Sequence, residues 1–152
     1  MRKARPDIVF SSDFIVGFPG ESDQDHEDTM QLIRDVVFAS AYSFKYSPRP
    51  GTPAANMSNL VREDVKTARL AELQDLITAQ YFDFNKTAVG QTMPVLFERK
   101  GKKEGQLQGR TPFYQAINVP ANERLLGQII DVEITGATPN ALIGAIKMVE
   151  AA

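Results

Sequence analysis

Three stretches of this sequence carry the residue types most able to do chemistry. They are a glycine- and proline-containing turn at residues 17–21, a proline-rich segment at residues 47–53, and a run of cations at residues 99–103. Glycine lets the backbone approach a ligand closely because it has no Cβ. Clustered cations neutralise the phosphates of nucleic acids. The sequence therefore predicts a small-molecule site in its first half and a nucleic-acid contact in its second half.

Several kinds of site are excluded by what the sequence lacks. It contains no cysteine, so the chain cannot itself hold an iron–sulfur cluster or a thiolate zinc site. His26 is the only histidine, and it lies among acidic residues in what is expected to be the solvated first turn of a helix. Glu21 stands where a phosphate-binding loop needs lysine. We therefore predict no metal site and no catalytic residue in this chain.

Composition and charge indicate a globular protein with two parts. The 152 residues are 43% hydrophobic and 24% charged, and the sequence has no signal-peptide pattern, so we expect a soluble protein of the cytoplasm. Residues 1–85 carry 9 Lys and Arg against 13 Asp and Glu, whereas residues 86–152 carry 8 against 6. The periodicity of apolar residues also changes there, which predicts domains at residues 1–88 and 89–152. The second domain is the better partner for a polyanion.

The first domain is predicted to contain two strand–helix units. A strand at residues 8–16 has little polar alternation, so we expect it to be covered on both faces. Ser22 and Asp25 then predict a capping box, followed by a helix whose apolar positions are Thr29, Leu32, Ile33, Val36 and Val37. A second strand at residues 41–46 precedes the proline-rich loop, and a long helix runs from about residue 62 to about residue 88. The turn and the loop could equally be plain connections.

The second domain is predicted to be a small β-barrel. Its five predicted strands lie at residues 92–98, 106–110, 115–119, 127–135 and 141–149. A five-stranded barrel resembling the oligonucleotide-binding fold closes them most simply. Cations and aromatics on such a barrel bind single-stranded RNA, which favours as RNA contacts Arg99, Lys100, Lys102, Lys103 and Arg110. The alternative is that the basic run is only a solvated hairpin tip.

Two motifs carry a resemblance to a known family. Residues 11–21 and 46–55, followed by Gly109-Arg110-Thr111 in a small barrel, resemble the C-terminal part of the radical S-adenosylmethionine methylthiotransferases. The resemblance spans essentially the whole chain. It implies an α/β part, formed by the last two strand–helix units of a partial (β/α) barrel, and an all-β part, the TRAM domain that binds tRNA.

The resemblance also implies an activity for the complete protein. Such enzymes use S-adenosylmethionine and two 4Fe-4S clusters, and the Ser11-Ser12-Asp13-Phe14 opening favours the members that convert N6-isopentenyladenosine next to the anticodon to its 2-methylthio derivative. Because the cluster cysteines are missing, this chain is expected to be an inactive fragment. Siblings acting on threonylcarbamoyladenosine in tRNA or on a ribosomal protein remain alternatives. So does a non-enzymatic RNA-binding module.

The resemblance assigns expected contacts to individual residues. Ile15 and Gly17 would contact the adenosine of the cofactor, and Glu21 would take the place of the family's acidic residue, one position late. The loop after the second strand would close the cofactor pocket through Tyr46, Ser47 and Arg49. The expected partner is a tRNA anticodon stem-loop. Self-association is expected through the exposed edge of the truncated barrel.

Overall fold

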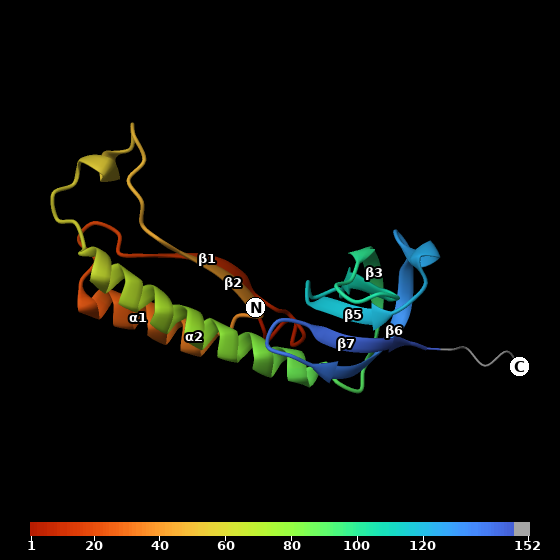
Figure 1. Ribbon diagram of the computed structural model, residues 1–152. Helices are drawn as coiled ribbons and strands as arrows, with labels where there is room; N and C mark the ends of the chain where they lie inside the picture. The colour runs from red at the N-terminus through yellow and green to blue at the C-terminus, as the bar shows by residue number, and fades with distance from the viewer. Residues whose placement is uncertain (148–152) are drawn as a thin grey trace, which may run out of the picture. The chain divides into compact units, whose positions relative to one another are not determined.

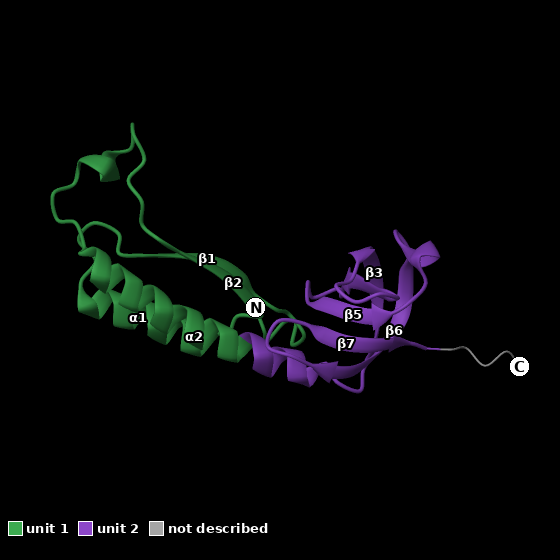
Figure 2. Ribbon diagram, in the orientation of Figure 1, with its two compact units in different colours: residues 1–80 green, residues 81–152 purple. Residues whose placement is uncertain are grey.

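The computed structural model describes residues 1–147 of the chain, which divides into two compact units, Met1–Gln80 and Tyr81–Ala152 (Figure 2). In the first unit, strand β1 (Ser11–Val16) leads into helix α1 (Asp23–Val36), and strand β2 (Ser40–Lys45) leads through a short 3-10 helix, η1 (Pro53–Asn56), into helix α2 (Glu63–Thr87) (Figure 1). The last residues of α2 belong to the second unit. The predicted order of strands and helices is confirmed.

The two strands of the first unit pair in parallel and bury one face. Ser11 lies opposite Ser40, and Val16 lies opposite Lys45. Phe14 and Val16 face the helices and form a core with Met30 and Ile33 of α1, Leu73 and Ile77 of α2, and Phe38, which follows α1. Apolar side chains on the other face of the sheet are open, since Ile15, Tyr42 and Phe44 are each more than half exposed.

The expectation that the first strand is covered on both faces is therefore wrong for the described chain. Successive side chains of a strand point to opposite faces, so Ile15 points away from its neighbours Phe14 and Val16. Both helices pack against the face that holds Phe14 and Val16. An apolar run in the sequence shows that both faces of a strand can be buried. Whether both are buried depends on which elements pack against each face.

Helix α1 begins at the predicted capping box. The Ser22 hydroxyl accepts from the Asp25 N–H at 3.2 Å, and the Asp25 carboxylate accepts from the Ser22 N–H at 2.8 Å. The buried face consists of His26, Met30 and Ile33. Leu32 and Val37, predicted to face the core, are about half exposed. The predicted solvation of His26 is also wrong, because the side chain is buried and its Nε2 lies 3.0 Å from Glu72 Oε2.

The second unit is a closed barrel. Its strands are β3 (Thr92–Lys100), β4 (Gln106–Arg110), β5 (Ala116–Pro120), β6 (Ile129–Ala137) and β7 (Leu142–Ile146), with a short 3-10 helix, η2 (Glu123–Leu125), before β6. They close in the order β3-β4-β5-β7-β6, in which β5 and β7 are parallel and the other neighbours antiparallel. The predicted five-stranded barrel is confirmed. Residues 148 and 149 of the last predicted strand lie outside the described residues.

Alternate side chains fill the barrel interior. Buried positions recur at every second residue of β3, at Met93, Val95 and Phe97, as the pleat of a strand requires. Asn85, near the end of α2, is fully buried and donates to the Thr138 carbonyl at 3.2 Å, while its own Oδ1 accepts from Gln115 at 3.0 Å.

No helix within residues 1–147 is long and apolar enough to cross a membrane.

Candidate functional site

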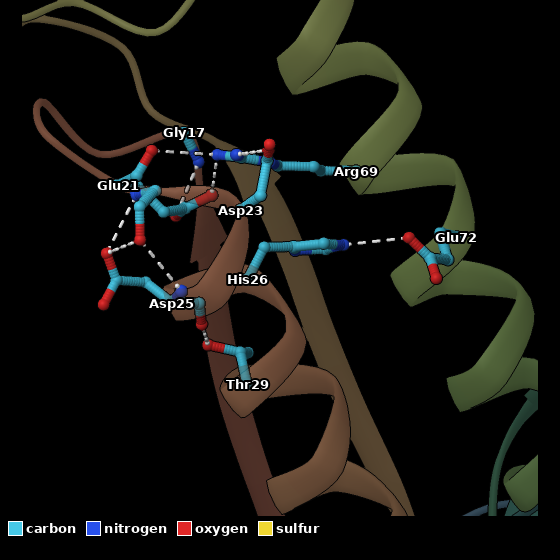
Figure 3. Close-up of polar contacts among 9 residues, drawn as sticks. Gly17, Glu21, Asp23, Asp25, His26, Thr29, Arg69 and Glu72 are labelled. Carbon is cyan, nitrogen blue, oxygen red and sulfur yellow. Dashed lines mark hydrogen bonds and ion pairs between the residues drawn. The ribbon is translucent and has the colours of Figure 1, made fainter.

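The turn after β1 is held by a buried arginine (Figure 3). Gly17 and Gly20 both have positive φ, at 73° and 89°, a region where glycine is favoured. The Gly17 N–H donates to Glu21 Oε2 at 2.9 Å, and Arg69 Nη1 donates to Glu21 Oε1 at 2.7 Å. Arg69 also donates to the Glu21 carbonyl at 3.2 Å and to Asp23 Oδ1 at 2.6 Å. The turn is thus fixed from α2.

The Glu21 carboxylate is fully hydrogen-bonded within this turn. Each of its carboxylate oxygens accepts a hydrogen bond from the protein, and its side chain is only 14% exposed. Burial by itself would lower the pKa of Arg69, but hydrogen bonds to Asp23 and Glu21 outweigh it and raise the pKa above its usual value. These hydrogen bonds to Gly17 and Arg69 mean that Glu21 stabilises the turn. It leaves the Gly17 N–H and the Glu21 carboxylate satisfied without a ligand.

Sequence reasoning missed Arg69 and Lys66 as parts of this region. Arg69 shares the apolar stripe of α2 with Leu73 and Ile77, and a charged residue in such a stripe was the available signal. Lys66 is also buried, and a Cβ placed on Gly17 would lie 2.3 Å from its Cγ. Glycine at position 17 is therefore required by the close approach of α2 as well as by its φ angle.

Tyr46 packs beside the same turn. Its ring packs edge-on against Phe18 at 5.2 Å between centroids, and Lys66 Nζ lies 5.9 Å from its ring centroid. The Tyr46 hydroxyl is buried and has no hydrogen-bond partner in the described chain. Nearby, Glu63 forms an ion pair with Lys45, and this hydrogen bond lowers the pKa of the Glu63 carboxyl.

The remaining predicted cofactor contacts are accessible. Ile15 is 58% exposed on the open face of the sheet, opposite Phe44 in the strand register. Ser47 and Arg49 are exposed in the loop after β2. The Arg49 carbonyl is fixed by the Thr52 N–H at 3.2 Å and the Thr52 hydroxyl at 2.8 Å. Ile15, Ser47 and Arg49 are thus exposed, whereas Gly17 and Glu21 form the turn and Tyr46 packs beside it.

The chain offers no ligands for an iron–sulfur cluster. It has no cysteine, and within residues 1–147 no three His, Asp or Glu side chains are grouped so that they could hold a metal ion. His26, the one histidine, is paired with Glu72. The residues present therefore do not fit a cluster.

The predicted RNA-binding residues lie in two places on the barrel. Arg99, Lys100, Lys102 and Lys103 belong to the β3–β4 hairpin, where all four are exposed. Arg99 donates to Gln108 at 2.6 Å and Lys100 pairs with Glu123 at 2.7 Å, whereas Lys102 and Lys103 have no ion pair within residues 1–147. Arg110 lies at the opposite end of β4, 3.6 Å from Glu98, and donates to the Tyr114 carbonyl at 3.0 Å.

Comparisons with known proteins connect both units to one group of enzymes. The TRAM domain family matches residues 86–147. A protein of Rickettsia canadensis is 53% identical over 96% of this chain and 33% of its own length, and a protein of Maricaulis maris is 53% identical over 96% of this chain and 32% of its own length. Both are named tRNA-2-methylthio-N(6)-dimethylallyladenosine synthase.

The chain spans about a third of the length of these curated relatives. A conserved protein of Methanococcus maripaludis, known from a solution structure, is 23% identical over 40% of this chain and 80% of that chain, with a TM-score of 0.34. The identity over 96% of the chain includes both units. Residues 86–147 are thus a TRAM domain, and the chain is homologous to about one third of the length of the tRNA-2-methylthio-N(6)-dimethylallyladenosine synthases.

Proposed function

We propose that this chain is part of a tRNA-modifying methylthiotransferase and that its barrel binds the tRNA. The observation that carries the proposal is the identity of about half of all residues, over 96% of the chain, with proteins named as synthases of 2-methylthio-N(6)-dimethylallyladenosine in tRNA. The complete enzyme would place a methylthio group on carbon 2 of the isopentenylated adenosine beside the anticodon. It would act in the cytoplasm, the location expected from the sequence.

The first unit would contribute part of the S-adenosylmethionine pocket, as two strand–helix units of a partial barrel. S-adenosylmethionine would supply the radical chemistry when bound. Ile15 offers an apolar contact on the open face of the sheet, and Arg49 offers an unburied cation to a carboxylate. Gly17, Glu21 and Tyr46 would keep the adjoining turn in shape. The two 4Fe-4S clusters would be held by cysteines outside this sequence.

The second unit would bind the anticodon stem-loop through the cations of the β3–β4 hairpin. Four exposed cations in five residues can neutralise several phosphates, and each such contact releases counterions. Affinity should therefore fall steeply as salt rises. Arg110 would add a contact at the other end of β4.

Fluorescence anisotropy with a labelled anticodon stem-loop tests this proposal on the full chain. Replacing Lys100, Lys102 and Lys103 with Ala should weaken binding and reduce the slope of log K against log salt by about 0.7–0.9 for each phosphate that is no longer neutralised. A matched control replaces three cations of the first unit, Lys3, Arg5 and Arg34, and removes the same charge. If the chain binds no RNA, or if both triple variants change the slope equally, the hairpin does not bind the RNA.

A further inference from the structure

Tyr114 combines backbone strain with exposure of a large aromatic ring. Its φ is 65°, in the left-handed region that bulky residues rarely adopt, and its side chain is 78% exposed. Left-handed backbone is strained for a residue with a Cβ, and an exposed ring offsets little of this strain by packing. A strained and exposed residue of this kind points to a function outside the folding of the domain.

The loop that presents Tyr114 is rigid. The Thr111 N–H donates to the Gln115 carbonyl at 3.1 Å, and the Tyr114 N–H donates to the Thr111 carbonyl at 3.0 Å. Thr111 and Gln115 are buried, and Gln115 is bonded to the buried Asn85. Phe113 turns inward and packs edge-on against Phe84 at 6.2 Å between centroids. Tyr114 is thus held outward by a fixed loop, which reduces the entropy that binding would cost.

Beside Tyr114 the barrel surface is hollowed. The hollow has a volume of about 290 Å³, and its lining includes Tyr114, Leu96, Glu98, Arg110 and Ile129. Its floor is apolar, since Leu96 and Ile129 lie opposite each other in the register of β3 and β6 and are 39% and 68% exposed. At its polar edge the Arg110 guanidinium lies 6.0 Å from the Tyr114 ring centroid and 3.6 Å from Glu98.

We propose that this hollow binds one unpaired nucleobase of an RNA, stacked on Tyr114. The inference rests on the proposed RNA-binding function of the barrel and assigns a site within it. Base stacking on an aromatic ring needs only a flat apolar face, while Arg110 and Glu98 offer a donor and an acceptor to the edge of the base. The hollow and the basic hairpin lie at opposite ends of β4, so the hairpin can hold the phosphates of the same strand. These cations favour RNA over an apolar protein segment as the occupant.

The test uses the full chain and a short unstructured RNA oligonucleotide that carries 2-aminopurine, whose fluorescence is quenched by stacking. Tyr114→Ala should weaken binding by about 5- to 140-fold, the range for removal of one base–aromatic stack. It should also remove the quenching yet leave the salt slope unchanged, because every cation that neutralises a phosphate is still present. Tyr114→Phe should keep both affinity and quenching. Val89→Ala, which shortens an exposed apolar side chain of the same unit outside the hollow, is the control.

Tyr114→Gly separates binding from folding. Glycine adopts the left-handed region without strain, so this variant should raise the melting temperature of the chain while it weakens RNA binding as strongly as Tyr114→Ala does. Unchanged RNA affinity in Tyr114→Ala, with weaker binding after removal of the hairpin lysines, would overturn the nucleobase site and leave RNA binding intact. Absence of RNA binding by the unaltered chain would overturn both proposals.

Discussion

Glu21→Gln should destabilise the first unit by about 2 kcal/mol. Glu21 accepts one hydrogen bond from Gly17 and one from Arg69, at 2.9 and 2.7 Å. A glutamine keeps a single acceptor oxygen on its side chain, so its amide nitrogen would face one of the two donors. Hydrogen bonds to charged groups contribute about 1.5–3 kcal/mol each, and one of them is removed. Because the Glu21 side chain is only 14% exposed, solvent screening reduces this value little.

Arg69→Met removes the partner and should cost more, about 3 kcal/mol, because it leaves a nearly buried carboxylate without its cation. Together the two substitutions should cost about 1–2 kcal/mol less than the sum of the single ones, as expected for residues in direct contact. Asp23→Asn is the matched control. Its carboxylate bonds to the same arginine but is fully exposed, so water screens the pair and stability should change little.

Hydrogen exchange followed by mass spectrometry over a urea series measures these effects for each unit separately. Peptides from β1, α1 and the first part of α2 should lose protection in Glu21→Gln, while peptides from the barrel should not. Two results would refute the reasoning about this turn. One is a decrease in stability below 0.5 kcal/mol for Glu21→Gln (about a quarter of the expected effect). The other is strict additivity of Glu21→Gln and Arg69→Met.

Four further outcomes are expected. The hydrogen bonds from Ser22 lower the pKa of Asp25 below its ordinary value of 3.8. The capping box should therefore stabilise the first unit fully above pH 3.8, and this contribution should be lost as pH falls through the lowered pKa. Thermal melts of Asp25→Asn and of the parent chain should converge in that acidic range. Gly109→Ala should cost about 1–3 kcal/mol or more in urea unfolding, because its Cβ would lie 2.5 Å from a backbone oxygen, whereas Gly136→Ala, with its nearest contact at 3.7 Å, should be tolerated. Anaerobic reconstitution with iron, sulfide and dithionite should yield neither a cluster nor 5′-deoxyadenosine from this chain; product chromatography checks it. Sedimentation velocity should show self-association through the free edge of β1 at tens of micromolar, and a strictly monomeric chain would contradict this.

The elements were predictable because their signals are local. The capping box joins Ser22 and Asp25, three residues apart, and the structure contains it. Strand β4 has the predicted bounds, and α2 begins at Glu63, within one residue of its predicted start. The barrel followed from the spacing of five short strands, since alternation and turn residues define each strand without knowledge of the others.

The features that were missed depend on contacts between distant residues. His26 lies among acids in the sequence, but α2 packs over it and supplies Glu72. Glu21 and Arg69 are 48 positions apart, and nothing local in either segment indicates the other. The face of the sheet that carries Ile15 is open because no element packs against it within the described residues. The residue pattern of a strand does not show which elements will pack against it. The individual cofactor and RNA contacts remain predictions for the same reason, since they depend on molecules absent from the sequence.

The pairing of β7 determines the order in which the barrel can fold. Strands β3, β4 and β5 pair between neighbours along the chain, but the ring closes only when β7 lies between β5 and β6. The β5–β7 seam joins just two residue pairs, Ile117 with Leu142 and Asn118 with Ile143. The chain loses conformational entropy when β5 and β7 come together, before this short seam can stabilise the barrel. Formation of the seam should therefore limit the folding rate. Until then the inner face of β3 has no cover, and the time between synthesis of β5 and of β7 is when a newly made chain is most exposed to aggregation.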